Sequence, residues 1–129
     1  MFDKVKEFHE AFGHPINKPK THKDLILRFN LMDEEHNEVA NALADLDQAR
    51  TNEEVLDSKI ALTKELADVL YVVLGTAVSL GLPIVDVFDE VHRSNMSKLG
   101  EDGKPVLRED GKVLKGPNYT EAKIRQFFT

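Results

Sequence analysis

Two long stretches with helical spacing of apolar residues, joined by a short capped turn, constrain the fold of this chain most. The first stretch covers residues 21–49 and the second covers 51–81. The second opens with Thr51 and Glu54, a pair three residues apart that is typical of a capping box at a helix N-terminus. It ends at a glycine that is followed two residues later by a proline, as helices often do. The sequence therefore predicts a long antiparallel helical hairpin with its turn at residues 50–52.

Two shorter helices are predicted on either side of this hairpin. Residues 2–12 carry phenylalanine and valine side chains at helical spacing and are followed by a glycine and a proline. A fourth apolar stripe begins at Pro83 and continues to about Lys98. Within the second long stretch, the run Val69–Leu74 is apolar without interruption and has no turn signal on either side. We therefore expect this run to be helix, buried nearly all round.

The C-terminal segment has a different character. Residues 102–107 and 110–114 share the pattern Asp-Gly-Lys followed by a Val-Leu pair. Asp-Gly is a turn dipeptide and Val-Leu pairs favour extended backbone, so the pattern predicts a hairpin or paired turns. The last dozen residues contain Tyr119 and several apolar side chains that we expect to pack on the body or on a partner subunit. The predicted fold class is all-α, with four helices and a short irregular or hairpin-containing tail.

The composition predicts one domain over residues 1–129 and excludes several kinds of chemistry. The chain has 41% hydrophobic residues, which suits one ordinary core, and it has no cysteine. Thiolate nucleophiles, disulfides and cysteine-ligated metals are thereby excluded. The formal charge of -6 argues against binding to a DNA or RNA polymer through a basic surface. The sequence also lacks a long uncharged apolar run and an apolar leader, so we expect a soluble cytoplasmic protein without membrane contact.

Four acidic residues interrupt the apolar stripes of the two long helices. Glu35 and Glu38 lie on the first helix and Glu65 and Asp68 on the second, each with apolar neighbours one turn away. A carboxylate on an apolar face is costly unless it is paired or bound to a cation. In an antiparallel hairpin both pairs stand at the same level, about 20 Å from the turn at ~1.5 Å per residue.

Convergence of four carboxylates calls for bound cations, because their mutual repulsion reaches several kcal/mol per close pair. Oxygen ligands select hard ions, so the spacing indicates Mg²⁺, with Mn²⁺ as a substitute. Such ions keep positions open for water and for a phosphate-bearing substrate. The alternative is that these side chains are solvated and held in surface salt bridges, which is the usual fate of acidic residues on helices.

These residues also match a known pattern. The segment 34–38 (Glu-Glu-His-Asn-Glu), followed after 26 residues by 65–71 (Glu-Leu-Ala-Asp-Val-Leu-Tyr), resembles the ExxE…ExxD motif of the all-α nucleoside triphosphate pyrophosphohydrolases. That superfamily includes MazG, the dimeric dUTPases and phosphoribosyl-ATP pyrophosphohydrolase. The resemblance continues through 75–77, 91–98 and 112–119, and so covers most of residues 25 to 119.

The resemblance implies a four-helix MazG-like bundle and assigns roles to the acidic residues. Glu35, Glu38, Glu65 and Asp68 would be the Mg²⁺ ligands, and Glu34 would position or deprotonate the attacking water. Related enzymes cleave between the α and β phosphates and release a nucleoside monophosphate and pyrophosphate. They also assemble through apolar helix faces, so a homodimer or homotetramer is expected.

Four residues near the C-terminus are candidates for substrate binding. Asn95 and Lys98 extend the inward stripe of the fourth helix, and the related enzymes use this segment to bind nucleotide. The alternatives are a helix cap for Asn95 and a surface cation for Lys98. Lys115 would add positive charge near the triphosphate. Tyr119 would either stack on a base or anchor the tail.

The leading hypothesis is therefore a Mg²⁺-dependent hydrolase of nucleoside triphosphates that serves nucleotide-pool sanitation or dNTP control. One alternative is the phosphoribosyl-ATP pyrophosphohydrolase reaction, which makes the same cut in another nucleotide, although the tail resembles that branch less. The other alternative is a non-catalytic helical module for oligomerisation or regulation. All four ligand positions are filled by acidic residues, which favours an enzyme.

Overall fold

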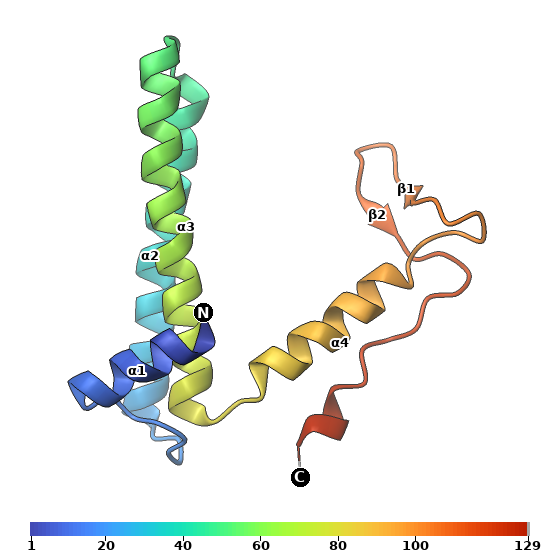
Figure 1. The fold of residues 1–129 in the computed structure, drawn as a ribbon. Coiled ribbons are helices and arrows are strands. Elements are labelled where there is room, and N and C mark those ends of the chain that lie inside the picture. Colours follow the sequence, from blue (N-terminus) through green and yellow to red (C-terminus); the bar gives the residue numbers. More distant parts are fainter. Residues whose placement is uncertain (129) are drawn as a thin grey trace. The chain divides into compact units, whose positions relative to one another are not determined.

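The computed structural model describes residues 1–128, which form two compact units, one over Met1–Leu82 and one that begins at Pro83. The first unit contains α1 (Phe2–Phe12), α2 (His22–Gln48) and α3 (Asn52–Leu80), and the second contains α4 (Ile84–Met96) and a tail (Figure 1). The predicted all-α class with four helices is confirmed. The single-domain organisation of residues 1–129 stays a prediction. In the described part of the chain, no single helix is long and apolar enough to cross a membrane.

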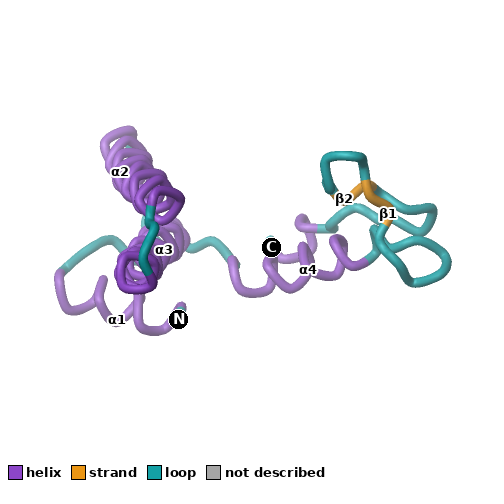
Figure 2. The backbone as a smooth tube through the Cα atoms, turned by 90° about the horizontal axis from the view of Figure 1, so that it is seen from above, coloured by secondary structure: helices purple, strands orange, loops and turns teal. Residues whose placement is uncertain are grey.

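Helices α2 and α3 form the predicted antiparallel hairpin and lie side by side in both views (Figures 1 and 2). The turn between them is fixed by the predicted capping box. The Thr51 hydroxyl accepts from the Glu54 backbone N–H at 3.1 Å, and the Glu54 carboxylate accepts from the Thr51 N–H at 3.2 Å. Because the same carboxylate also accepts from the Arg50 N–H at 2.8 Å, the pKa of Glu54 is held below its ordinary value.

The opposite end of the hairpin is closed by the segment that links α1 to α2. Gly81 adopts a left-handed conformation with φ of 68° and ends α3, as predicted. The backbone N–H groups of Asn17 and Lys18 donate to the carbonyls of Val78 and Ser79, both at 2.9 Å. These bonds satisfy carbonyl groups that the last turn of a helix leaves without intrahelical partners.

A buried arginine lies between α2 and α3 where α1 packs on the hairpin. Arg28 is 7% exposed and donates from Nε to the Thr76 hydroxyl at 3.2 Å and from Nη2 to the Val72 carbonyl at 3.4 Å. Burial lowers the pKa of its guanidinium. A Cβ atom at Gly75 would lie 2.7 Å from Nη2 of Arg28 and 3.1 Å from Nε2 of His9. The glycine therefore provides the space that these two side chains occupy.

The expected burial of the run Val69–Leu74 is wrong in part. The run is helical, as predicted, but Leu70, Tyr71 and Val73 are 47%, 40% and 38% exposed. In the first unit, α1 and α2 cover only part of the circumference of α3, so some apolar side chains of this helix stay accessible. Apolar composition alone did not distinguish a helix enclosed by its own chain from one with an open apolar face.

In the second unit the tail packs on α4, which confirms one of the two positions expected for it. The Ser94 hydroxyl donates to the Thr120 carbonyl at 2.8 Å, and the Thr120 N–H donates to the Ser97 hydroxyl at 3.0 Å. Helix α4 ends at Met96, close to the predicted end near residue 98. A 3₁₀ turn over Ile124–Phe127 follows and also contacts α4.

The predicted hairpin forms between the two Val-Leu pairs. Strands β1 (Val106–Leu107) and β2 (Val113–Leu114) are antiparallel, with Val106 opposite Leu114 and Leu107 opposite Val113. The second Asp-Gly pair lies in the connecting turn, where the Gly111 N–H donates to the Arg108 carbonyl at 2.9 Å. The first Asp-Gly pair lies in a separate turn before β1. The repeat therefore forms a hairpin and also a second turn, the two structures that the sequence predicted.

The Glu90 carboxylate on α4 is expected to make the attachment of the tail dependent on pH. Glu90 accepts from Arg93 at 2.8 and 2.9 Å and from the Lys123 backbone N–H at 2.8 Å. These contacts lower the pKa of Glu90 from 4.5 to about 2, and the hydrogen bond from Arg93 has the largest effect. The ionised carboxylate therefore stabilises the fold above about pH 4.5, and this contribution is lost as the pH falls towards 2.

Glu90→Gln is accordingly expected to speed amide hydrogen exchange of residues 120–128 at pH 7 and to change it little at pH 2. Asp89→Asn, which removes a neighbouring exposed carboxylate, serves as the matched control and is expected to behave like the wild type. Equal exchange in the Glu90 variant and the wild type at pH 7 would show that the Glu90 carboxylate does not hold the tail.

Candidate metal centre

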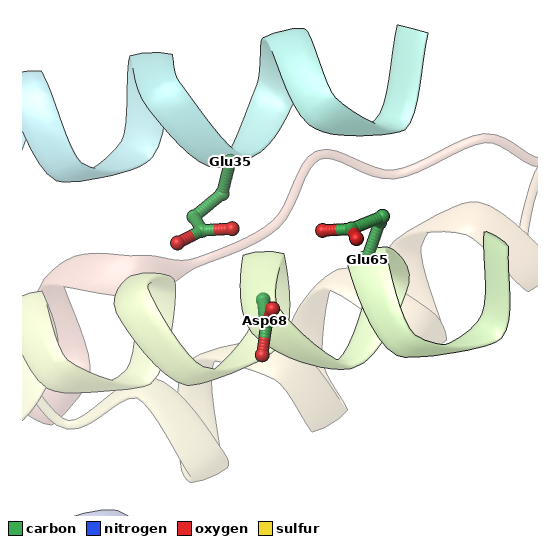
Figure 3. Close-up of side chains that lie close together, drawn as sticks. All are labelled: Glu35, Glu65 and Asp68. Atoms are coloured by element: carbon green, nitrogen blue, oxygen red, sulfur yellow. The ribbon is translucent and has the colours of Figure 1, made fainter. Parts of the chain in front are cut away.

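Three carboxylates converge between the two helices of the hairpin. Glu35 projects from α2, and Glu65 and Asp68 project from α3 (Figure 3). Each offers one oxygen atom, and these three oxygen atoms all lie within 4.8 Å of one another. The arrangement brings Glu35 close to two acidic residues that lie 30 and 33 positions further along the sequence.

The capped turn and the helical repeat explain why these residues meet. In an antiparallel hairpin, residues at equal distances from the turn lie at the same level, and the turn at residues 49–51 lies midway between Glu35 and the Glu65/Asp68 pair. Glu65 and Asp68 are three residues apart and therefore share one face of α3. The predicted register of these three residues is confirmed by the geometry.

The site is partly buried, and its electrostatics disfavour the metal-free, fully ionised state. The side chain of Glu65 is 15% exposed and that of Asp68 is 36% exposed. The pKa of Glu35 is raised, first by burial and then by the negative charge of Asp68, with smaller contributions from Glu38 and Glu65. The Oε2 atom of Glu65 is buried and accepts no hydrogen bond from the described residues. A cation placed among these oxygen atoms would offset the negative charge of the carboxylates and would give the buried Oε2 atom a partner.

A lysine side chain supplies part of the missing positive charge. The Lys64 ammonium lies 2.7 Å from Oδ2 of Asp68 and 3.4 Å from Oε1 of Glu65. It opposes the raised pKa of Glu35, while the hydrogen bond to Asp68 raises the pKa of the lysine itself. Sequence reasoning did not single out this residue, although its place four residues before Asp68 was a usable signal.

The other two acidic residues predicted for the site lie outside this group of three. The Glu38 side chain is exposed on α2, but its charge contributes to the raised pKa of Glu35, so the two carboxylates interact. Glu34 is also exposed and directly precedes Glu35. The predicted roles of Glu38 as a ligand and of Glu34 in positioning water stay predictions.

The four predicted substrate-binding residues all belong to the second unit. Asn95 is exposed on α4, and Lys98 is half-buried just after this helix, where its carbonyl accepts from the Gly116 N–H at 2.9 Å. Lys115 and Tyr119 contact each other, with the ammonium 4.7 Å from the centre of the ring, a cation–π distance. Contact with the substrate stays a prediction for all four residues.

An aromatic cluster between α1 and α3 was missed by the sequence reasoning. The Phe8 ring stacks on Phe12 and His14, with centroids 4.4 and 5.7 Å apart, and meets the edge of Tyr71 at 5.5 Å. Tyr71 follows Asp68 by one helical turn, and Phe12 is 68% exposed. In the sequence, the phenylalanines contributed only to the predicted helical spacing of residues 2–12. Their exposure became visible only in the structure.

The fold and the carboxylate cluster define an all-α protein with an acidic site inside a helical hairpin. Residues 5–95 match the family model described as phosphoribosyl-ATP pyrophosphohydrolase. The chain belongs to this family, which confirms the resemblance that its sequence motifs indicated. Family and fold together indicate a pyrophosphohydrolase type of activity, in which a hydrolase acts on phosphoanhydrides.

A solved structure is also similar to this chain. It is a crystal structure of a protein from Exiguobacterium sp. 255-15 that is described as a candidate NTP pyrophosphohydrolase. The TM-score is 0.47 and the sequence identity is 24%, over 95% of this chain and 88% of the other. No curated protein matches the chain.

Proposed function

We propose that this protein is a Mg²⁺-dependent nucleoside triphosphate pyrophosphohydrolase that cleaves between the α and β phosphates. The observation that carries the proposal is the convergence of Glu35, Glu65 and Asp68 in a member of a pyrophosphohydrolase family. The products would be a nucleoside monophosphate and pyrophosphate. The biological role would be nucleotide-pool sanitation or control of dNTP levels, and the expected location is the cytoplasm.

The carboxylate cluster fits a hard divalent cation. Its three donors are all carboxylate oxygens, which Mg²⁺ and Mn²⁺ prefer, and Oε2 of Glu65 has no hydrogen-bond partner among residues 1–128. Glu38 would complete the set of ligands from the exposed side of α2. A bound Mg²⁺ supplies Lewis acidity, lowers the pKa of a water ligand and offsets charge on the leaving pyrophosphate.

The other predicted residues would act on water or on the nucleotide. Glu34, exposed beside Glu35, would accept a hydrogen bond from the attacking water and orient it. Lys98 and Lys115 would pair with phosphate oxygens, and Asn95 would donate or accept at the sugar or base edge. Tyr119 would offer a planar surface for a base.

A second candidate reaction, hydrolysis of phosphoribosyl-ATP, is favoured by the description of the family that the chain matches. It makes the same α–β cut in a different nucleotide, so the carboxylate chemistry is common to both reactions. What would differ is recognition of the base and sugar. A non-catalytic helical module would bind nucleotide or metal without turnover.

A panel of substrates distinguishes these functions. The purified protein with Mg²⁺ is incubated with natural and damaged ribo- and deoxynucleoside triphosphates and with phosphoribosyl-ATP, and monophosphate and pyrophosphate are quantified. We expect turnover of at least one triphosphate, with kcat/KM at least about tenfold above that for phosphoribosyl-ATP. A preference for phosphoribosyl-ATP would support the second candidate, and lack of turnover of every nucleotide would support the non-catalytic module.

We also propose that the protein is a homodimer or homotetramer. Large apolar side chains on the hairpin are exposed in the single chain, including Phe29 on α2 at 61% and Ile60 on α3 at 61%. A second copy of the chain would cover such exposed apolar side chains. Light scattering after size exclusion is expected to give two or four times 14.6 kDa. A monomeric mass at micromolar concentration would contradict this proposal.

A further inference from the structure

The Lys64 ammonium contacts two of the three carboxylates of the candidate metal centre. Its distances to Oδ2 of Asp68 and Oε1 of Glu65 are 2.7 and 3.4 Å, and these two residues belong to the group of three that converges on one point. Two of the three carboxylates are thus engaged by a side chain of the protein itself. An ammonium ion and a divalent cation compete for such oxygen atoms.

The lysine is suited to leave as well as to bind. Its side chain is 66% exposed, so its flexible stem can turn towards solvent without disturbing the core. The hydrogen bond to Asp68 raises the pKa of the ammonium, which therefore remains charged at neutral pH. Lys64 also lowers the pKa of Glu35, whereas burial and the neighbouring acidic residues raise it. One positive charge thus offsets part of the repulsion among three carboxylates.

We infer that Lys64 is a resident counter-charge that holds the carboxylates in place without metal and competes with the divalent cation for them. This inference rests on the proposed function, because it assumes that the cluster binds a metal ion. Lys64 sets the metal concentration at which the site fills and thereby prevents loading at low metal levels. Removal of the ammonium should tighten metal binding and destabilise the metal-free protein, two effects of opposite sign from one substitution.

The inference is tested by Mn²⁺ binding to the metal-free full-length protein, measured by electron paramagnetic resonance. Lys64→Met is expected to lower the Kd for Mn²⁺ about fivefold, because an exposed ion pair and a nearby positive charge are removed. Lys64→Arg keeps the charge and is expected to bind within about twofold of the wild type. Lys59→Met removes a lysine from the same helix and is the matched control, with no expected change.

Thermal unfolding supplies a second readout that does not depend on activity. Lys64→Met is expected to lower the melting temperature of the metal-free protein and to leave that of the Mn²⁺-loaded protein unchanged, whereas Lys59→Met changes neither. An equal or higher Kd for Lys64→Met than for the wild type would overturn the inference while leaving the metal site intact. Absence of Mn²⁺ binding in the wild type and all variants would overturn both the inference and the proposed metal site.

Discussion

Replacement of Asp68 by Asn is expected to slow pyrophosphate release by about 1000-fold, because it removes one of the anionic ligands that hold the cation. Asp68 and Glu65 share one face of α3 opposite Glu35, and the three offer oxygen atoms within 4.8 Å of one another. Asn is nearly isosteric with Asp but carries no charge, so the packing of the hairpin should not change. The measurement is the initial rate of pyrophosphate release at saturating Mg²⁺.

Two comparisons make the loss of rate specific. The far-ultraviolet circular dichroism of Asp68→Asn should match that of the wild type, which separates a loss of ligand from a loss of fold. Asp57→Asn removes a carboxylate from an exposed position of the same helix, nearer the turn, and should retain the wild-type rate. Full turnover by Asp68→Asn would show that Asp68 is not a required ligand of the metal ion.

Gly75→Val is expected to destabilise the protein by about 3 kcal/mol, which is a large effect for one substitution. A Cβ atom at this position would lie 2.7 Å from Nη2 of Arg28, and valine adds two further methyl groups. The guanidinium would lose its bonds to Thr76 and Val72 while remaining inside the protein. A buried cation without hydrogen-bond acceptors is costly.

Urea denaturation followed by circular dichroism measures this change in the free energy of unfolding. Ala61→Val places the same side chain on an exposed face of α3 and is expected to cost less than about 1 kcal/mol, the propensity difference between the two residues. If the two variants were equally stable, Arg28 would have room to move, and close packing at Gly75 would not contribute to the stability of the first unit.

Those parts of the fold that depend on local sequence signals were predictable. The capping box of Thr51 and Glu54 and the glycine that ends α3 determine the limits of this helix within a few residues. Once the turn is placed, the helical repeat and the antiparallel direction align Glu35 with the Glu65/Asp68 pair. The convergence of these three carboxylates therefore followed from counting residues on either side of one turn.

Features that depend on side-chain conformation and on packing between distant segments were not predictable. The Lys64 ammonium reaches two carboxylates through a flexible side chain whose direction the sequence does not determine. Glu38 lies three residues after Glu35, just as Asp68 lies three residues after Glu65, yet its exposed side chain stays outside the group of three. The helical repeat alone does not determine the direction of a long side chain. The burial of Arg28 depends on contacts with α3, 44 to 48 residues away.

The measurement that tests the proposed reaction most directly is identification of the phosphorus products by ³¹P nuclear magnetic resonance. A triphosphate substrate selected from the panel is incubated with the protein, once with Mg²⁺ and once with excess chelator. The proposed reaction gives nucleoside monophosphate and pyrophosphate in equal amounts with Mg²⁺ and neither product with chelator. Formation of nucleoside diphosphate and inorganic phosphate, or turnover that persists in chelator, would contradict the assignment of Glu35, Glu65 and Asp68 as the centre of a metal-dependent pyrophosphohydrolase.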